Sequence, residues 1–555
     1  MRCLVPRRHR SLSSSALLLT RHQLSSRHRP LTLTTAFNPR PQHHVPRPRY
    51  FHTSPFTMSS ATLPPGRTYA DALATLNLLI PNRAVTSLFE KKTDDKAEDP
   101  NLRALPEMLD WLRRAGYFQS DLAALRCIHV AGTKGKGSVC AYLTSILAAS
   151  PAAGKVGTYT SPHLVSPRER IAINGAPIPA AMFARYFFEV WDRFTAAARA
   201  EGVDAATAEG PTTKPFFFRF MTILAFHIFI SEGVRSAVIE VGIGGAYDAT
   251  NVLPKEAITA AVVTQLGVDH VAMLGDTREK IAWHKAGVIK EGKPVFTRLA
   301  EEQPGVMTVL RERAGELGAS ALVEVADEDV QAWGGVEGGR LTGDFQRYNQ
   351  ALAALAAEEH LAVLEGRTPA RKLADLPSTL TGAMKNAALR GRHEVLQDAR
   401  GVRWLLDGAH TTESLAETAR WLASQVAVSP KAKVVLIFNQ QERDASRLLL
   451  GFLDEVQRAG GPTFEAAIFT RNDYTAVDAV PEEELVVQNA CRDAFSERFP
   501  SVQADVAPDL IDTAARVTAI EASLRGMGLE TVALVTGSMH LVGNLIRVLE
   551  PEGDE

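Results

Sequence analysis

The segment CIHVAGTKGKGSV, residues 127–139, runs from a β-rich stretch through a glycine-rich turn into an apolar helix. Glycines let backbone N–H groups curl inward, and the following helix directs its positive dipole end at an anion. The layout predicts a polyphosphate site in which Lys136 lies along the phosphates and Ser138 reaches a phosphate oxygen or a magnesium ion. The strict pattern GxxxxGK[ST] fails, because Val130 takes the first glycine position and Gly137 separates Lys136 from Ser138. An ordinary glycine-rich turn between strand and helix is the alternative.

Strands and helices alternate around this loop. We expect strands at 127–131, 155–159, 237–241 and 260–264, and helices at 69–79, 105–115, 139–149 and 345–364. Such alternation predicts a parallel sheet that helices cover on both faces.

A second alternation begins after a stretch without clear periodicity, which contains Pro377, Gly382 and Gly391 and predicts a linker near 380–390. We expect further strands at 402–406, 433–438, 466–469 and 531–535, with helices at 412–425, 444–460 and 541–549. The fold class is therefore predicted as α/β. Two domains, 65–380 and 390–555, follow a leader at 1–57.

The leader accounts for a strong charge asymmetry. Residues 1–57 contain 10 Arg and no Lys, Asp or Glu, and the rest of the chain carries 51 basic and 63 acidic residues. An acidic body has no bulk attraction for nucleic acid, so no nucleic-acid partner is expected. The leader is typical of a mitochondrial transit peptide, with a disordered basic tail as the alternative. Initiation at Met58 would give a cytosolic form beside the mitochondrial one in the inner membrane or matrix.

Cysteine usage and hydropathy exclude two classes of protein. The four cysteines (Cys3, Cys127, Cys140 and Cys491) show no CxxC spacing, which argues against a disulfide scaffold and for a reducing compartment. The longest strongly apolar stretch, 220–230, has 11 residues. A membrane span needs about 20. No transmembrane helix is expected. Peripheral association with mitochondrial membranes remains an expectation.

Several separated motifs point to one family. They are GTKGKGS at 132–138, TSPHL at 160–164, RERI at 168–171, FRFMT at 218–222, VIEVGIGGAYD at 238–248, LGVDH at 266–270, DGAHT at 407–411 and TGSMHLVG at 536–543. With these motifs the chain resembles the eukaryotic type of folylpolyglutamate synthase, a branch of the Mur-ligase superfamily, from about residue 69 to residue 549.

The resemblance implies a P-loop, Mur-ligase-like central domain and a smaller Rossmann-like C-terminal domain. It also implies ATP-dependent addition of L-glutamate, by a γ-carboxyl amide linkage, to reduced folates through an acyl phosphate. Dihydrofolate synthase is the nearest alternative, and the sequences GTKGKGS and GGAYD argue against it. A Mur-type cell-wall ligase and a non-catalytic nucleotide-binding protein are weaker alternatives. A monomer is expected.

The metal residues are ambiguous on sequence alone. Glu240 ends an apolar strand where a carboxylate can meet the phosphate loop, but it also fits a solvated strand end. A lone His270 is more often structural, and Lys285 alone fits an exposed helical cation. The resemblance implies that Ser161, Glu240 and His270 bind magnesium. It also implies that Lys285 is carbamylated by CO2, holds a second magnesium and is buried near His270.

The resemblance assigns the remaining roles residue by residue. Phosphate contacts fall to Gly132, Thr133, Gly135, Lys136, Gly137 and Ser138. Gln346 and Asn349 would contact adenine, and Asp407 would contact the ribose. Arg392 would reach the phosphates from the other domain. Catalytic roles are implied for Lys136, Lys285, His270 and His410. On a helix face, the amides of Gln346 and Asn349 fit an ordinary surface equally well. A monovalent cation is a further implied cofactor.

Two positions depart from the family pattern, and the folate side is less readable. Phe345 stands where His is usual, and LRGR at 389–392 replaces the more usual WPGR. The aromatic cluster at 216–220 fits either a pteridine wall or core. Arg168 and Arg170 fit either a glutamate-tail site or structural ion pairs.

Overall fold

The computed structural model describes residues 66–80, 101–441, 444–477 and 480–550. All of these belong to one compact unit, Thr62–Glu555. The predicted leader at 1–57 lies outside the described residues, so its role stays a prediction.

The first sheet has eight strands in the order β4-β3-β2-β5-β1-β6-β7-β8. Their bounds are β1 Arg126–Ala131, β2 Val156–Tyr159, β3 Ile171–Ile173, β4 Ala176–Pro177, β5 Ser236–Glu240, β6 Ile258–Val263, β7 Pro294–Arg298 and β8 Ala321–Val325. The neighbouring strands β2, β5, β1, β6, β7 and β8 pair in parallel, whereas β3 pairs antiparallel with both β2 and β4. The central strands β1, β5 and β6 are almost wholly buried, as continuous apolar strands between two helical layers should be.

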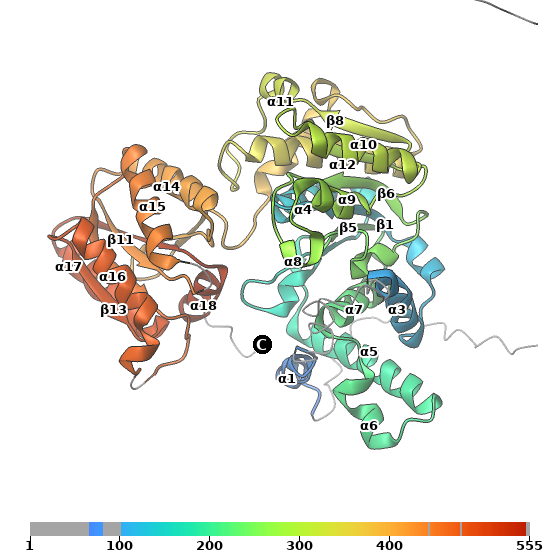
Figure 1. Cartoon of the computed structure of the whole chain (residues 1–555), viewed down its shortest axis with the longest axis horizontal. Coiled ribbons are helices and arrows are strands. Elements are labelled where there is room, and N and C mark those ends of the chain that lie inside the picture. Colours follow the sequence, from blue (N-terminus) through green and yellow to red (C-terminus); the bar gives the residue numbers. More distant parts are fainter. Residues whose placement is uncertain (1–65, 81–100, 442–443, 478–479, 551–555) are drawn as a thin grey trace, which may run out of the picture. The chain divides into compact units, whose positions relative to one another are not determined.

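Helices cover both faces of this sheet (Figure 1). On one face, Ile128 and Val130 of β1 pack against α4 (Lys136–Ala149) and the alanine-rich α12 (Gln346–Glu365). On the other face, Cys127 and Ala131 meet two further groups of helices, because successive strand residues point to opposite sides. Those helices are α1 (Tyr69–Asn77), α3 (Asn101–Arg114), α5 (Ala180–Ala200), α7 (Phe217–Ser231), α9 (Arg278–Ala286) and α10 (Pro304–Glu316).

A buried histidine fastens α12 to the first sheet. His360 is fully buried, and its two ring nitrogens lie 2.8 Å from the hydroxyls of Thr259 and Ser236, on β6 and β5. Burial lowers the pKa of His360 to about 4. The imidazole is therefore neutral at physiological pH and links β5 and β6, the two strands on either side of β1.

The second sheet has six strands in the order β13-β12-β11-β14-β10-β9. Their bounds are β9 Glu394–Gln397, β10 Arg403–Leu406, β11 Ala432–Phe438, β12 Phe464–Thr470, β13 Gln503–Ala507 and β14 Glu530–Thr536. All pair in parallel except β9, which runs antiparallel to β10. One face packs on α14 (Thr412–Ala427), α15 (Ala445–Arg458) and α16 (Val486–Arg498), and the other on α17 (Leu510–Gly526) and α18 (Met539–Leu549).

The predicted α/β fold class is confirmed, with differences in detail. The segment predicted as a linker contains a short helix, α13 (Ser378–Ala383), followed by a 3-10 turn, Met384–Asn386. Leu380 and Met384 are buried against the first core, and this tertiary contact explains a helix that sequence periodicity did not signal. Other short helices are α6 (Ala205–Glu209), α8 (Val271–Leu274) and α11 (Asp327–Trp333). Among the described residues, no helix combines the length and apolar character needed to span a membrane.

Phe226 on α7 is fully buried in the first core, so Phe226→Ala should leave a cavity. We expect it to lower the free energy of unfolding by about 3–5 kcal/mol, measured by urea denaturation. Leu102 on α3 is 57% exposed, and the control Leu102→Ala should change the same quantity by less than about 0.5 kcal/mol. Equal losses in the two variants would contradict this account of the core.

Candidate functional site

The glycine-rich loop joins β1 to α4, and two of its glycines have conformations that other residues rarely adopt. Gly132 has φ +145° and Gly135 has φ +88°. A Cβ at Gly132 would lie 1.8 Å from the Thr264 hydroxyl oxygen, and one at Gly135 would lie 2.3 Å from Asn349 Oδ1. The loop therefore packs closely against Thr264, which follows β6, and against α12. Only glycine, which has no side chain, leaves room for these contacts.

Two lysines point at one carbonyl of this loop. Lys136 Nζ donates to the Gly132 carbonyl at 3.1 Å, and Lys285 Nζ donates to the same oxygen at 2.7 Å. Lys285 is only 2% exposed. Burial, and then the charge of Lys136, lowers the pKa of Lys285 to about 7. The alternative that Lys285 is an exposed helical cation is therefore wrong, because α9 turns this side chain into the protein.

Glu240 lies at the end of β5, beside β1, and is 4% exposed. Its Oε2 accepts a hydrogen bond from the backbone N–H of Ser161 at 3.0 Å. Burial raises the pKa of the Glu240 carboxyl, while Lys136, Arg170 and Arg392 oppose the shift. The interpretation as a solvated strand-end acid is therefore wrong.

His270 lies next to the same cations. It caps α8 with φ +50°, and its side chain is 42% exposed. Burial lowers the pKa of His270, Asp269 opposes this shift, and Lys285 and Lys136 add to it. Its Nε2 lies 3.6 Å from Asp269 Oδ2. The charge of Lys136 thus acts on the side chains of both His270 and Glu240.

The side chains present fit a magnesium ion that is also held by phosphate. Magnesium prefers oxygen ligands and keeps few protein carboxylates, with phosphate oxygens and water completing its octahedron. Glu240 and Ser161 meet through the hydrogen bond described above and offer such oxygens. Across the described ranges, no group of three His, Cys, Asp or Glu side chains forms a complete protein-only metal site.

The predicted adenine amides are buried beside the loop. Gln346 and Asn349 are 5% and 6% exposed, which excludes the surface alternative. Gln346 Nε2 lies 3.4 Å from Ser138 Oγ, and Asn349 Nδ2 donates to Gln346 Oε1 at 3.0 Å. Phe345, which precedes them, is 38% exposed. A pair of amides on the first turn of α12 thus borders the phosphate loop.

Asp407 follows β10 and is held by three donors. It accepts hydrogen bonds from the backbone N–H groups of His393 and Ala409 and from the Thr418 hydroxyl, at 2.9, 3.0 and 3.0 Å. His410 Nδ1 lies at hydrogen-bond distance, 2.9 Å, from the Gly408 carbonyl oxygen.

The sequence did not reveal two histidines near these residues. His393 stacks on Trp421 with ring centroids 4.5 Å apart, and it has φ +46°. His163 accepts a hydrogen bond from Arg170 Nε at 2.8 Å, and burial, together with that arginine, lowers its pKa to about 3. His163 lies inside the quoted TSPHL motif and His393 directly follows Arg392, so motif proximity was the available signal.

The aromatic cluster at 216–220 belongs to the first core or packs against it. Phe220 is fully buried, whereas Phe217 and Phe218 are partly buried against the core. The Arg170 guanidinium lies 5.2 Å from the Phe217 ring centroid. Arg168 donates to the Ile178 carbonyl at 3.1 Å.

Comparisons with known proteins match two descriptions, dihydrofolate synthetase and folylpolyglutamate synthase. A family model described as the C-terminal domain of dihydrofolate synthetase matches residues 393–548. The solved structure of the Mycobacterium tuberculosis folylpolyglutamate synthase complexed with ADP has a TM-score of 0.58 at 24% identity, and the match covers 87% of this chain and 100% of that one. The structure of the Thermotoga maritima folylpolyglutamate synthase has a TM-score of 0.59 at 24% identity, and the match covers 87% of this chain and 98% of that one. These two likenesses show the fold.

The folylpolyglutamate synthase of Saccharomyces cerevisiae strain S288c is 38% identical over 503 residues, which cover 87% of each sequence. Similarity of that extent, over almost the whole of both proteins, shows that the chain belongs to the folylpolyglutamate synthase family of ATP-dependent ligases.

Proposed function

We propose that this protein adds L-glutamate to reduced folates and their polyglutamates through a γ-carboxyl amide bond, with conversion of ATP to ADP and phosphate. The observation that carries the proposal is the convergence of Lys136 and Lys285 on the Gly132 carbonyl, with the Glu240 carboxyl in the field of Lys136. This charge arrangement suits a polyphosphate beside a substrate carboxylate. The folate substrate is supported by the relatives' names.

A carboxylate is a poor electrophile, so its oxygen must first attack the γ-phosphorus and expel ADP. The acyl phosphate then reacts with the amine of glutamate, and phosphate leaves. Little covalent chemistry falls to the protein, whose work is alignment and charge neutralisation. Lys136 donates to the Gly132 carbonyl, and a polyphosphate in the loop would offer it a charged acceptor instead.

Other side chains would hold the nucleotide and the metal. We assign adenine to Gln346 and Asn349, ribose to Asp407 and a phosphate oxygen to Arg392, whose planar guanidinium suits bidentate binding. Glu240, Ser161 and His270 would hold magnesium, which supplies further charge neutralisation. His410 is assigned to the transferred group or to the incoming glutamate.

Lys285 fits carbamylation, because its amine is buried beside a second cation. The ammonium first loses one proton to solvent. The neutral amine then attacks CO2, an N–C bond forms as one C–O π bond opens, a second proton passes to solvent, and the side chain becomes an anion. This change removes the repulsion between Lys285 and Lys136 and gives oxygen ligands for a second magnesium ion.

Localisation and assembly rest on sequence and family resemblance alone. The acid-free leader supports import into mitochondria, and Met58 supports a second, cytosolic form. A monovalent cation, a monomeric state and peripheral contact with mitochondrial membranes belong to the same proposal.

Dihydrofolate synthase is the second candidate, because the family model matching 393–548 carries that description. Incubation with ATP, glutamate and either tetrahydrofolate or dihydropteroate separates the two. We expect glutamate-dependent ADP release and chain extension with tetrahydrofolate, observed by mass spectrometry. Extension of dihydropteroate alone would overturn the primary proposal. Nucleotide binding without glutamate-dependent ADP release from either substrate would favour a non-catalytic protein.

Lys285→Ala should lower glutamate-dependent ADP release on the order of 100-fold or more. Wild-type protein in ¹³C-bicarbonate should show a carbamate carbon signal by NMR that the variant lacks. The signal should weaken as pH falls below about 7, because the lowered pKa keeps the amine neutral only above it. The control is Lys280→Ala on the same helix, since that ammonium is exposed and paired with Asp276. Nearly full glutamate-dependent ADP release in Lys285→Ala would refute the catalytic role of Lys285.

Glu240→Gln removes the negative charge proposed to hold magnesium. We expect turnover to fall about 10²–10³-fold and the magnesium concentration for half-maximal rate to rise. Glu521 on α17, also 4% exposed, is the matched control, and Glu521→Gln should leave the magnesium dependence unchanged. An unaltered magnesium titration in Glu240→Gln would count against the metal role.

A further inference from the structure

A cavity of about 620 Å³ lies outside the site described above. Its lining includes Tyr247, Asn251, Trp283, Lys290 and Arg313. Trp283 and Lys285 are two residues apart on α9, so their side chains leave the helix on nearly opposite sides. Lys285 points at the phosphate loop, and the cavity therefore opens away from it. Its volume is within the range of small-molecule sites.

Lys290 gives this cavity a cation without an acidic partner. Its Nζ donates to the Asn251 carbonyl at 3.1 Å, and among the described residues no carboxylate forms an ion pair with it. Burial lowers the pKa of Lys290 to about 8. By contrast, Lys255 on the same lining is paired with Glu291 at 2.7 Å. A partly buried ammonium with one neutral acceptor is stabilised by an incoming anion.

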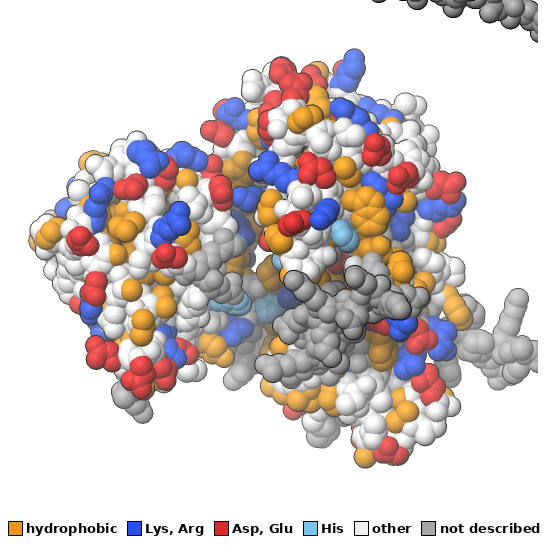
Figure 2. All heavy atoms as spheres, in the orientation of Figure 1, with side chains coloured by type: hydrophobic (Ala, Val, Ile, Leu, Met, Phe, Trp, Pro, Cys, Tyr) orange, Lys and Arg blue, Asp and Glu red, His pale blue; other side chains and the backbone are white. Residues whose placement is uncertain are grey.

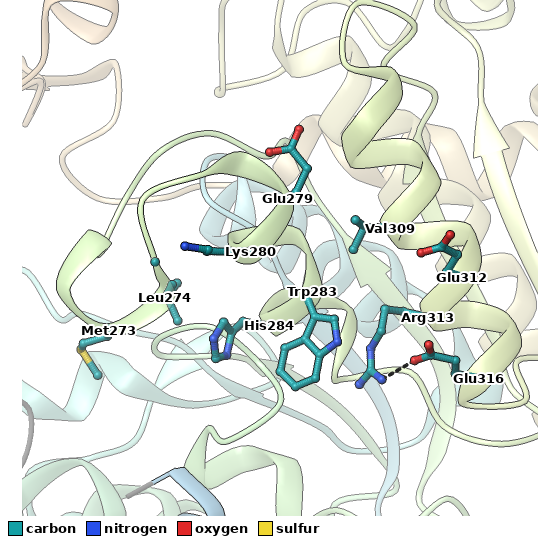
Figure 3. A pocket seen from close by; sticks show the side chains of 11 residues that line it. Met273, Leu274, Glu279, Lys280, Trp283, His284, Val309, Glu312, Arg313 and Glu316 are labelled. Carbon is teal, nitrogen blue, oxygen red and sulfur yellow. Dashed lines mark hydrogen bonds and ion pairs between the residues drawn. The ribbon is translucent and has the colours of Figure 1, made fainter. Parts of the chain in front are cut away.

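Aromatic rings form one wall of the cavity. The centroids of Tyr247 and Trp283 are 6.2 Å apart, and the Arg313 guanidinium lies 4.5 Å from the Trp283 ring. Glu316 holds that arginine through an ion pair of 2.6 Å (Figure 3). Trp283 and Arg313 also line a neighbouring cavity of about 470 Å³, shown in Figure 3. The Tyr247 and Trp283 rings thus give the larger cavity aromatic surface on which a flat ligand can pack.

Hydrogen bonds connect the wall of this cavity to the segments that carry Glu240 and Lys285. Asn251 Nδ2 donates to the carbonyls of Ala246 and Gly287, each at 3.0 Å. Ala246 belongs to the segment that follows Glu240, and Gly287 ends the helix that carries Lys285. A ligand against Asn251 and Trp283 thus touches the structure that sets the position of both groups.

From these contacts we propose that the cavity binds a small organic anion with a planar aromatic ring. Its carboxylate or phosphate would pair with Lys290, and its ring would pack on Tyr247 and Trp283. None of the residues assigned above to ATP or magnesium lines this cavity, and binding can be measured without turnover.

Isothermal titration of the full-length protein with 2-naphthoate, 2-naphthyl phosphate and neutral 2-naphthamide tests the proposal. The phosphate titration is run with saturating ADP and magnesium to occupy the glycine-rich loop. We expect at least one of the two anions to bind at least 10-fold more tightly than the amide, and the better anion identifies the charged group. Lys290→Gln should abolish that preference. Lys293→Gln, the same charge change three residues away and outside the cavity, should preserve it.

Equal affinity for anions and amide, or a preference that survives Lys290→Gln, overturns the proposal. Crystals of the wild-type protein with 6-bromo-2-naphthoate provide a check that needs no variant to fold. The anomalous bromine signal is expected beside Tyr247 and Trp283. Bromine located only elsewhere would reject this cavity as the site.

Discussion

The shared carbonyl of Gly132 is the contact on which the candidate site depends. Two ammonium groups, from α4 and α9, donate to one oxygen, and one of them is almost fully buried. Like charges at such close range raise the free energy of the ligand-free protein, and burial raises it further. The arrangement is relieved when an anion enters or when Lys285 loses its charge. The architecture of the loop thus favours a polyanionic ligand before any family resemblance is considered.

Glu240 balances this excess of positive charge. A buried carboxylate is costly unless donors and cations surround it, and the Ser161 N–H, Lys136, Arg170 and Arg392 meet that need. The residues come from separate parts of the chain and meet because parallel strands end at the same edge of the sheet. Acidic and basic side chains are otherwise interspersed over the face shown in Figure 2.

Sequence patterns were most informative where local rules dominate. Buried parallel strands are continuous apolar runs, so β1, β5 and β6 were predictable to within one or two residues. The short antiparallel strands β3, β4 and β9 depend on pairing with a neighbour, and they have little periodicity of their own. Burial of Lys285 followed only from the resemblance, because a helical lysine alone indicates an exposed cation. The stack of His393 on Trp421 joins residues far apart in sequence, and no spacing rule indicates it.

The imidazole of His360 has a consequence for the first turn of α12, which borders the glycine-rich loop. The helix presents Gln346 and Asn349 at its first turn and is attached to two strands near its last. Since the pKa of His360 is about 4 in the fold and about 6.5 in an unfolded chain, protonation favours unfolding as pH falls from 6.5 toward 4. Above pH 6.5 the imidazole of His360 stays neutral in both states, so its contribution does not change with pH. The amides of Gln346 and Asn349 would therefore keep the same position at neutral and at alkaline pH, whereas acidification would loosen α12 from its opposite end.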